Sequence, residues 1–304
     1  MIVLCILGIV FLIGIVRFLF VKKEALERFE EYKVMAKVAD TSYGKVSYID
    51  EGQGEVVLVC HGICGGYDQA YDTLAKGENN YRILAPSRFG YPGSDMPEDA
   101  TIEMQVETFG ELLDQLGIEK TYVLGTSAGG ATAIRFALMY PERTKGLVLY
   151  CSGYPELKEQ EKKITYAGPP AIMCNDILMW LFSPLFKPLM GMEPETLNLI
   201  IPMKPRKEGI VFDARVSNTV MANDYMVYDM SNLKMPVLVI HAKDDKMADF
   251  KKVEPWINRI KDCTFVVLDS GGHLMEDTLQ RYIEKAGFVL GFKMAMNIMQ
   301  ECRQ

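Results

Sequence analysis

The stretch Gly125-Thr126-Ser127-Ala128-Gly129 has the pattern G-x-S-x-G, and its neighbours decide the fold that we expect. A short apolar run, residues 122–124, comes before it, and a run typical of a helix, residues 131–139, comes after it. A serine on so sharp a strand-to-helix turn is pushed above the sheet with its hydroxyl exposed. The flanking glycines fit because larger side chains would collide in the turn. This context predicts that Ser127 is a nucleophile.

Strands and helices alternate along the chain from residue 43 onward. Alternation of this kind predicts an α/β domain with a mostly parallel central sheet flanked by helices. We expect strands at residues 46–50, 56–60, 82–86, 121–124, 146–150, 237–241 and 264–268, and helices at residues 101–116, 127–139 and 278–303.

One segment interrupts this alternation and divides the domain in two. Residues 43–150 and 233–304 would form the core, whereas residues 151–232 contain many prolines and are rich in Met, Leu and Ile. We expect this insertion to form short helices that cover the active site as a cap, or lid. Its apolar content, which includes Trp180, suggests an apolar pocket wall and makes Trp180 a candidate for substrate binding. The alternative is a packed helical excursion without a gating role.

The first segment, residues 1–21, is almost wholly apolar and is broken only by Arg17. About 20 such residues can cross the roughly 30 Å of hydrocarbon in a bilayer. We therefore predict a transmembrane anchor and a single-pass membrane protein, although a buried or trimmed leader is the alternative. Lys22 and Lys23 follow the apolar run, which favours a catalytic domain on the cytoplasmic side. Residues 22–42 would link the anchor to the core, mainly as a charged amphipathic helix at 24–38.

Composition and cysteine spacing exclude several classes of function. The 304 residues carry a net charge of −7 and no convincing basic cluster, which argues against a nucleic-acid partner. Seven scattered cysteines fit a reducing compartment better than a disulfide framework. Cys60 and Cys64 are the closest pair, but no second pair or histidine cluster completes a zinc site. We expect neither a metal nor a cofactor.

A nucleophilic serine needs a base, and the base needs an acid that orients it. The chain has three histidines. His273 follows the strand at 264–268, where it would lie at the carboxyl edge of the sheet, the edge at which α/β sheets place ligands. It is therefore the preferred base, whereas His241 ends a core strand and is interpreted as buried. Asp244 and Asp245 follow that strand, and either could be the acid, although both could also be solvated turn residues.

Together these motifs resemble the α/β-hydrolase superfamily over roughly residues 43–300. The resemblance is carried by His61-Gly62, the turn at 125–129, and the segments 133–143, 236–245 and 271–273. It implies an α/β-hydrolase fold with an inserted helical cap.

The resemblance also implies roles for particular residues. It places the acid at Asp245, three residues after Ala242, and residues 151–153 offer no carboxylate at the family's alternative acid position. It assigns the two backbone N–H groups of an oxyanion hole to Ile63 and Ala128. We also include His61 and Gly62 among the candidates for substrate binding.

These features predict a serine hydrolase that cleaves an ester or a related carbonyl compound. Ser127 would attack, His273 would act as base and then as acid, and Asp245 would orient His273. The substrate would be a small-molecule acyl compound, and we expect it to be hydrophobic. A carbon–carbon bond hydrolase of ring-opened aromatic metabolites would use the same triad and stays an alternative. A non-catalytic, membrane-anchored binding protein on the same fold is the second alternative.

Overall fold

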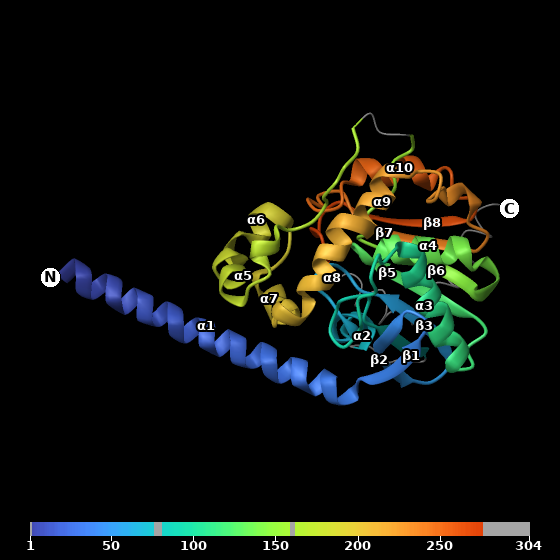
Figure 1. Ribbon diagram of the computed structural model, residues 1–304. Helices are drawn as coiled ribbons and strands as arrows, with labels where there is room; N and C mark the ends of the chain where they lie inside the picture. Colours follow the sequence, from blue (N-terminus) through green and yellow to red (C-terminus); the bar gives the residue numbers. More distant parts are fainter. Residues whose placement is uncertain (1, 76–80, 159–161, 276–304) are drawn as a thin grey trace.

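The central element is an eight-stranded sheet whose strands follow the order β1-β2-β4-β3-β5-β6-β7-β8 (Figure 1). The computed structural model describes residues 2–75, 81–158 and 162–275. β1 and β2 pair antiparallel to their neighbours, and the other strands run parallel. The strands are β1 (Lys37–Thr41), β2 (Gly44–Gly52), β3 (Glu55–Cys60), β4 (Tyr81–Pro86), β5 (Thr121–Thr126), β6 (Thr144–Tyr150), β7 (Val237–Ala242) and β8 (Cys263–Leu268).

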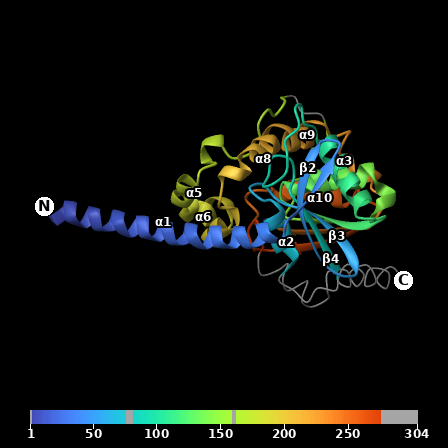
Figure 2. The same cartoon turned by 60° about the horizontal axis from the view of Figure 1, so that its bottom comes forward.

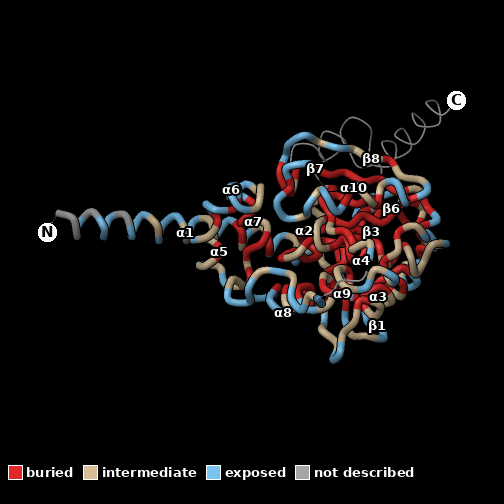
Figure 3. The backbone as a smooth tube through the Cα atoms, turned by 90° about the horizontal axis from the view of Figure 1, so that it is seen from above, coloured by how far each residue is buried: buried red, intermediate tan, exposed pale blue. Residues whose placement is uncertain are grey.

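The strands at the middle of the sheet are buried on both faces, as their unbroken apolar sequences require. In β3, Leu58 and Cys60 belong to the core on one face, whereas Val57 and Val59 belong to the core on the other. Figure 3 shows the buried backbone concentrated over these strands. The alternation follows from the two-residue period of a strand.

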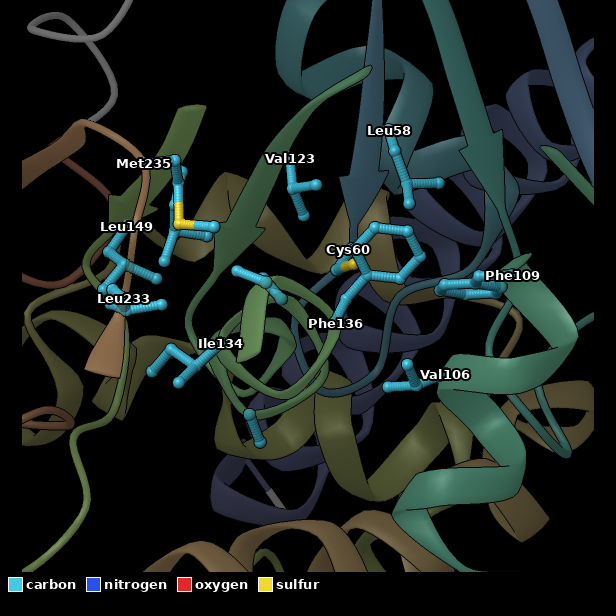
Figure 4. Packing of buried hydrophobic residues seen from close by; sticks show 14 of the residues in the cluster. Leu58, Cys60, Val106, Phe109, Val123, Ile134, Phe136, Leu149, Leu233 and Met235 are labelled. Atoms are coloured by element: carbon cyan, nitrogen blue, oxygen red, sulfur yellow. The ribbon is translucent and has the colours of Figure 1, made fainter. Parts of the chain in front are cut away.

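Helices cover both faces of the sheet. One face carries α3 (Ile102–Gln115), α4 (Gly129–Met139) and α10 (Phe250–Ile257). The other face carries α2 (Tyr67–Ala75) and the second half of α1 (Ile2–Met35). Figure 4 shows Phe136 of α4 close to Cys60 of β3, with Val106 and Phe109 of α3 beside it. This packing holds α4 against β3.

Short helices occupy the insertion between β6 and β7, where the sequence predicts a cap. A π-helical segment, Asp213–Ser217, lies between the last two of them. In Figure 1 the first three helices form a group beside α1, and the remaining two lead back to the core. The helices are α5 (Asp176–Phe182), α6 (Phe186–Met190), α7 (Leu197–Ile200), α8 (Lys207–Phe212) and α9 (Asn218–Asn223).

The N-terminal segment differs from its prediction. Within the described residues, no helix is both long enough and apolar enough to cross a membrane. The prediction of a transmembrane anchor at residues 1–21 and of a single-pass membrane location is therefore wrong, and the predicted membrane partner has no support. The apolar run is not a separate unit, because it continues unbroken into the predicted linker as α1, which ends at Met35 (Figure 2). Its later residues pack on the cap: Phe18 meets Trp180 at 5.5 Å between ring centroids, and Lys22 pairs with Asp176 at 2.9 Å.

All seven predicted strands correspond to observed strands, β2 to β8. The additional strand β1 was not predicted, because only its middle residue, Ala39, is buried and its sequence carries almost no apolar pattern. The last predicted helix, residues 278–303, lies outside the described residues.

Candidate active site

Ser127 occupies a tight turn between β5 and α4. Its backbone has φ = 52°, a left-handed conformation that L-residues seldom adopt. The Ser127 N–H donates to the Tyr150 carbonyl at 3.1 Å, and the Ser127 carbonyl accepts from the Gly130 N–H at 3.0 Å. Glycine is required two positions later, at Gly129, since an added Cβ would lie 2.1 Å from the Cys60 carbonyl oxygen. The strained serine is thus held between two strand ends and the start of a helix.

Three predicted site residues, far apart in sequence, form one hydrogen-bonded chain. His273 Nε2 lies 2.8 Å from Ser127 Oγ. His273 Nδ1 lies 3.0 and 2.9 Å from the two carboxylate oxygens of Asp245. Both Asp245 and His273 are buried. The distances fit a serine hydroxyl that donates to an imidazole whose other nitrogen donates to a carboxylate.

The two neighbouring aspartates have different contacts. Asp245 Oδ1 accepts the backbone N–H groups of Met247 and Ala248, at 2.8 and 2.9 Å, and this fixes its carboxylate beneath the histidine. Asp244 instead accepts the N–H of Gly272 at 3.0 Å, and so it braces the loop that carries the histidine. Of the two acids left open by the residue pattern, the geometry brings Asp245 to the imidazole.

The two predicted oxyanion donors lie on either side of Ser127. Ala128 follows it directly, and Ile63 lines the same cavity as Ser127 and Gly62. In the part of the chain that the structure describes, neither backbone N–H donates to a protein acceptor. Two unpaired N–H groups beside a nucleophile are what an oxyanion would need.

Of the three residues predicted to bind substrate, only Gly62 lines the cavity. His61 is fully buried, and its ring nitrogens bond the main chain of Gly62 and Arg88 rather than facing the cavity. Burial, reinforced by the Arg88 charge, holds the pKa of His61 well below its usual range. Trp180 packs on α1, while Gly62 does line the cavity. Among the described residues, no group of three potential ligands could hold a metal ion.

A cavity of about 420 Å³ opens above Ser127 and His273. The cap supplies most of its apolar wall, and the polar groups come from α2 and from cap residues 195–198. The apolar wall includes Met179, Phe186, Met190, Met192, Leu199 and Ile200, and the polar groups include Gln69, Asp72, Thr73, Glu195, Thr196 and Asn198. Sequence reasoning did not identify Gln69, whose side-chain oxygen accepts the Gly62 N–H at 3.0 Å. Gln69 lies in the first turn of α2, directly after a glycine-rich loop, and that position was the available signal.

Comparisons with known proteins agree with this architecture. A family model described as "alpha/beta hydrolase fold" matches residues 55–173. An uncharacterized hydrolase of Bacillus subtilis, YcgS, is 27% identical over 76% of this chain and 89% of its own length. A 2-hydroxy-6-oxo-6-phenylhexa-2,4-dienoate hydrolase of Burkholderia cepacia is 36% identical, but the match spans only 34% of this chain and 38% of that protein.

A solved structure supports the fold over a longer stretch. A thermophilic esterase from Thermogutta terrifontis superposes with a TM-score of 0.64 over 88% of this chain and 98% of that one, at 19% identity. The predicted fold class, a mostly parallel sheet flanked by helices, is thereby confirmed. The prediction of a hydrolase enzyme is also confirmed, because the family model and the relatives above agree on it.

Proposed function

We propose that this chain, a hydrolase with the α/β-hydrolase fold, cleaves esters with an apolar acyl group through Ser127, His273 and Asp245. The observation that carries the proposal is the hydrogen-bonded chain from Ser127 Oγ through both nitrogens of His273 to the Asp245 carboxylate. A hydroxyl, an imidazole and a carboxylate in this order form an activated nucleophile.

The reaction follows from these contacts in two halves. Ser127 Oγ attacks the ester carbonyl carbon while His273 Nε2 takes its proton, and the carbonyl oxygen becomes an oxyanion beside the Ile63 and Ala128 N–H groups. The carbon–alkoxide bond then breaks, and His273 returns the proton to the leaving alcohol. A water molecule, deprotonated by His273, attacks the acyl-enzyme, and a second collapse releases the acid and restores Ser127.

The cavity wall supports an apolar acyl group. Methionine, leucine, isoleucine and phenylalanine side chains from the cap line the side opposite the core. Methionine side chains are flexible and polarizable, and they adapt to chains of different shape. Each buried methylene adds about 0.8 kcal/mol to binding, so longer acyl groups should be favoured over acetyl.

The charges in the cavity favour an ester over the carbon–carbon alternative. A dienoate carries a carboxylate, which a binding site normally meets with a cation such as Arg. No Lys or Arg is found among the described residues that line this cavity, whereas Asp72 and Glu195 are. Arg28 lies near the cavity, but its guanidinium already pairs with the Asp72 carboxylate at 2.7 Å.

Labelling with a fluorophosphonate and a series of p-nitrophenyl esters test the proposal. We expect labelling of the wild type, no labelling of Ser127→Ala, and normal labelling of the control Ser231→Ala, whose hydroxyl bonds Asp229 instead. We expect kcat/KM at least tenfold higher for the octanoate than for the acetate. Folded wild type that is not labelled would favour the binding protein, and turnover of a dienoate in preference to all esters would favour the carbon–carbon hydrolase.

A further inference from the structure

A buried ion pair joins the cap to the loop that follows β4. Arg88, which follows β4, and Asp213, the first residue of the π-helical segment, have completely buried side chains. Arg88 donates both terminal nitrogens to the Asp213 carboxylate, one of them at 2.7 Å, and the Tyr91 hydroxyl donates to the same carboxylate at 2.5 Å. Burial opposes the charge on Arg88, but the facing Asp213 carboxylate raises its pKa overall.

Arg88 also reaches the carbonyl of Gly62, with Nη2 at 3.3 Å. His61 supports the same carbonyl. Its Nε2 accepts the backbone N–H of Arg88 at 3.0 Å, and the proton of the neutral ring therefore lies on Nδ1. Nδ1 is 2.8 Å from the Gly62 oxygen and donates to it. The Gly65 N–H donates to that oxygen as well, at 3.2 Å. The Gly62 carbonyl is therefore held by donors from three residues.

The direction of this carbonyl fixes the direction of an N–H group in the active site. The peptide bond is planar and trans, so the Gly62 carbonyl and the Ile63 N–H belong to one plane and point opposite ways. The Gly62 carbonyl faces the buried cluster, and hence the Ile63 N–H faces away from it. Gly62 lies close to the nucleophile, because an added Cβ would be 3.3 Å from Ser127 Cβ.

A second cap residue holds the loop that contains Gly62. Arg206, also completely buried, donates to the Gly65 carbonyl at 2.5 Å and to Asp68 at 2.7 Å. Burial would raise the pKa of Asp68, but Arg206 and then Arg28 lower it overall. Buried ion pairs contribute little net stability, because desolvation offsets their attraction. Stability alone therefore does not account for two of them converging on one loop.

We propose that Asp213 is a positioning residue: through Arg88 it holds the Gly62 carbonyl and thereby aims the Ile63 N–H at the oxyanion. The inference rests on the proposed function, in which Ile63 is an oxyanion donor. It makes the oxyanion hole depend on the cap, since a cap that moves away takes Asp213 with it and leaves Arg88 free to turn. The cap would then both enclose the acyl group and complete the catalytic geometry.

A double variant, Arg88→Met with Asp213→Leu, separates positioning from folding. Apolar side chains of similar size usually replace a buried ion pair without loss of stability, whereas Asp213→Asn alone would leave a buried cation unpaired. The control is Glu193→Gln, which breaks an exposed cap ion pair with Lys187. The measurements are thermal unfolding, kcat and KM for p-nitrophenyl octanoate, and the affinity for an octyl trifluoromethyl ketone, whose adduct carries an oxyanion.

We expect the double variant to unfold near the wild-type temperature. Its kcat should fall about 10- to 100-fold, which is no more than the fall caused by removing one oxyanion donor outright. The ketone affinity should fall in parallel, KM should change less than about threefold, and the control should match the wild type. Wild-type kcat and ketone affinity in the folded double variant would overturn the inference.

If the double variant does not fold, Arg88→Lys gives the same test. A single ammonium can pair with Asp213 but cannot reproduce the fork that also reaches Gly62. Loss of kcat and ketone affinity at constant KM supports the inference, and unchanged values overturn it. A wild type without esterase activity or labelling would instead overturn the proposed function, which is a distinct outcome.

Discussion

Lowering the pH from 7.5 to 5.5 should destabilise the fold through two buried histidines, His61 and His241. Burial, with a contribution from Arg88, lowers the pKa of His61 well below 6.5. Burial also lowers the pKa of His241, although the Ala248 carbonyl at 2.8 Å and Asp245 at 3.4 Å oppose this shift. Both rings therefore bind a proton less readily in the folded protein than in the unfolded chain.

The sign and size of the effect follow from linkage. The unfolded state binds more protons below pH 6.5, so the free energy of unfolding falls as the pH falls. With an unfolded pKa of about 6.5, each histidine that stays neutral when folded costs about 1.4 kcal/mol between pH 7.5 and 5.5. The two together cost up to about 2.7 kcal/mol, a large share of the 5–15 kcal/mol typical of a domain.

Urea unfolding of the wild type and of His241→Gln at pH 7.5, 6.5 and 5.5 measures this cost. Glutamine keeps a donor for the Ala248 carbonyl but does not titrate. The variant should therefore lose up to about 1.4 kcal/mol less than the wild type over the same interval. Parallel pH dependences for the two proteins would refute the assignment of this loss to His241.

Three further outcomes test the site. Asp245→Asn should lower kcat about 10⁴-fold, because the carboxylate that orients the catalytic base is lost, while Asp244→Asn should cost less than tenfold; similar losses in ester hydrolysis would contradict the assignment. Gly129→Ala should reduce the yield of folded protein, since its Cβ would lie 2.1 Å from a β3 carbonyl oxygen, and a wild-type melting temperature would contradict this. Leu199→Trp should raise KM for the octanoate ester but not for the acetate, and an equal rise for both would contradict the proposed acyl wall.

The turn at residues 125–129 and the sheet could be predicted because their signals are local. A buried parallel strand is an unbroken apolar run, and a strand followed at once by a glycine-flanked turn and a helix leaves Ser127 few other positions. The histidine and acid loops could be predicted too, since each directly follows a strand that ends at the same edge. Choosing between Asp244 and Asp245 needed the resemblance, because both residues lie in one turn and differ only in what their side chains reach.

The N-terminal prediction was wrong because it treated one stretch in isolation. An apolar run of about 20 residues has the length of a membrane span, and length was the criterion applied. The run instead continues into a charged helix, and that helix packs on α2 through Arg28 and Tyr32, both bonded to Asp72. Phe18 and Lys22 contact the cap while most of the apolar run stays exposed, and the sequence of the segment alone shows neither.

The same limit applies to the contacts that hold the oxyanion loop. Glycines at 62, 65 and 66 predict that backbone approaches the substrate closely, and this signal is local. The groups that hold the loop are not local: Arg88 lies 26 residues beyond Gly62, and Asp213 lies 125 residues beyond Arg88. An arginine or aspartate in an apolar insertion is ordinarily solvated. Only the folded path of the cap brings the two charges together, so the dependence of the active site on the cap is a property of topology that no motif in either segment encodes.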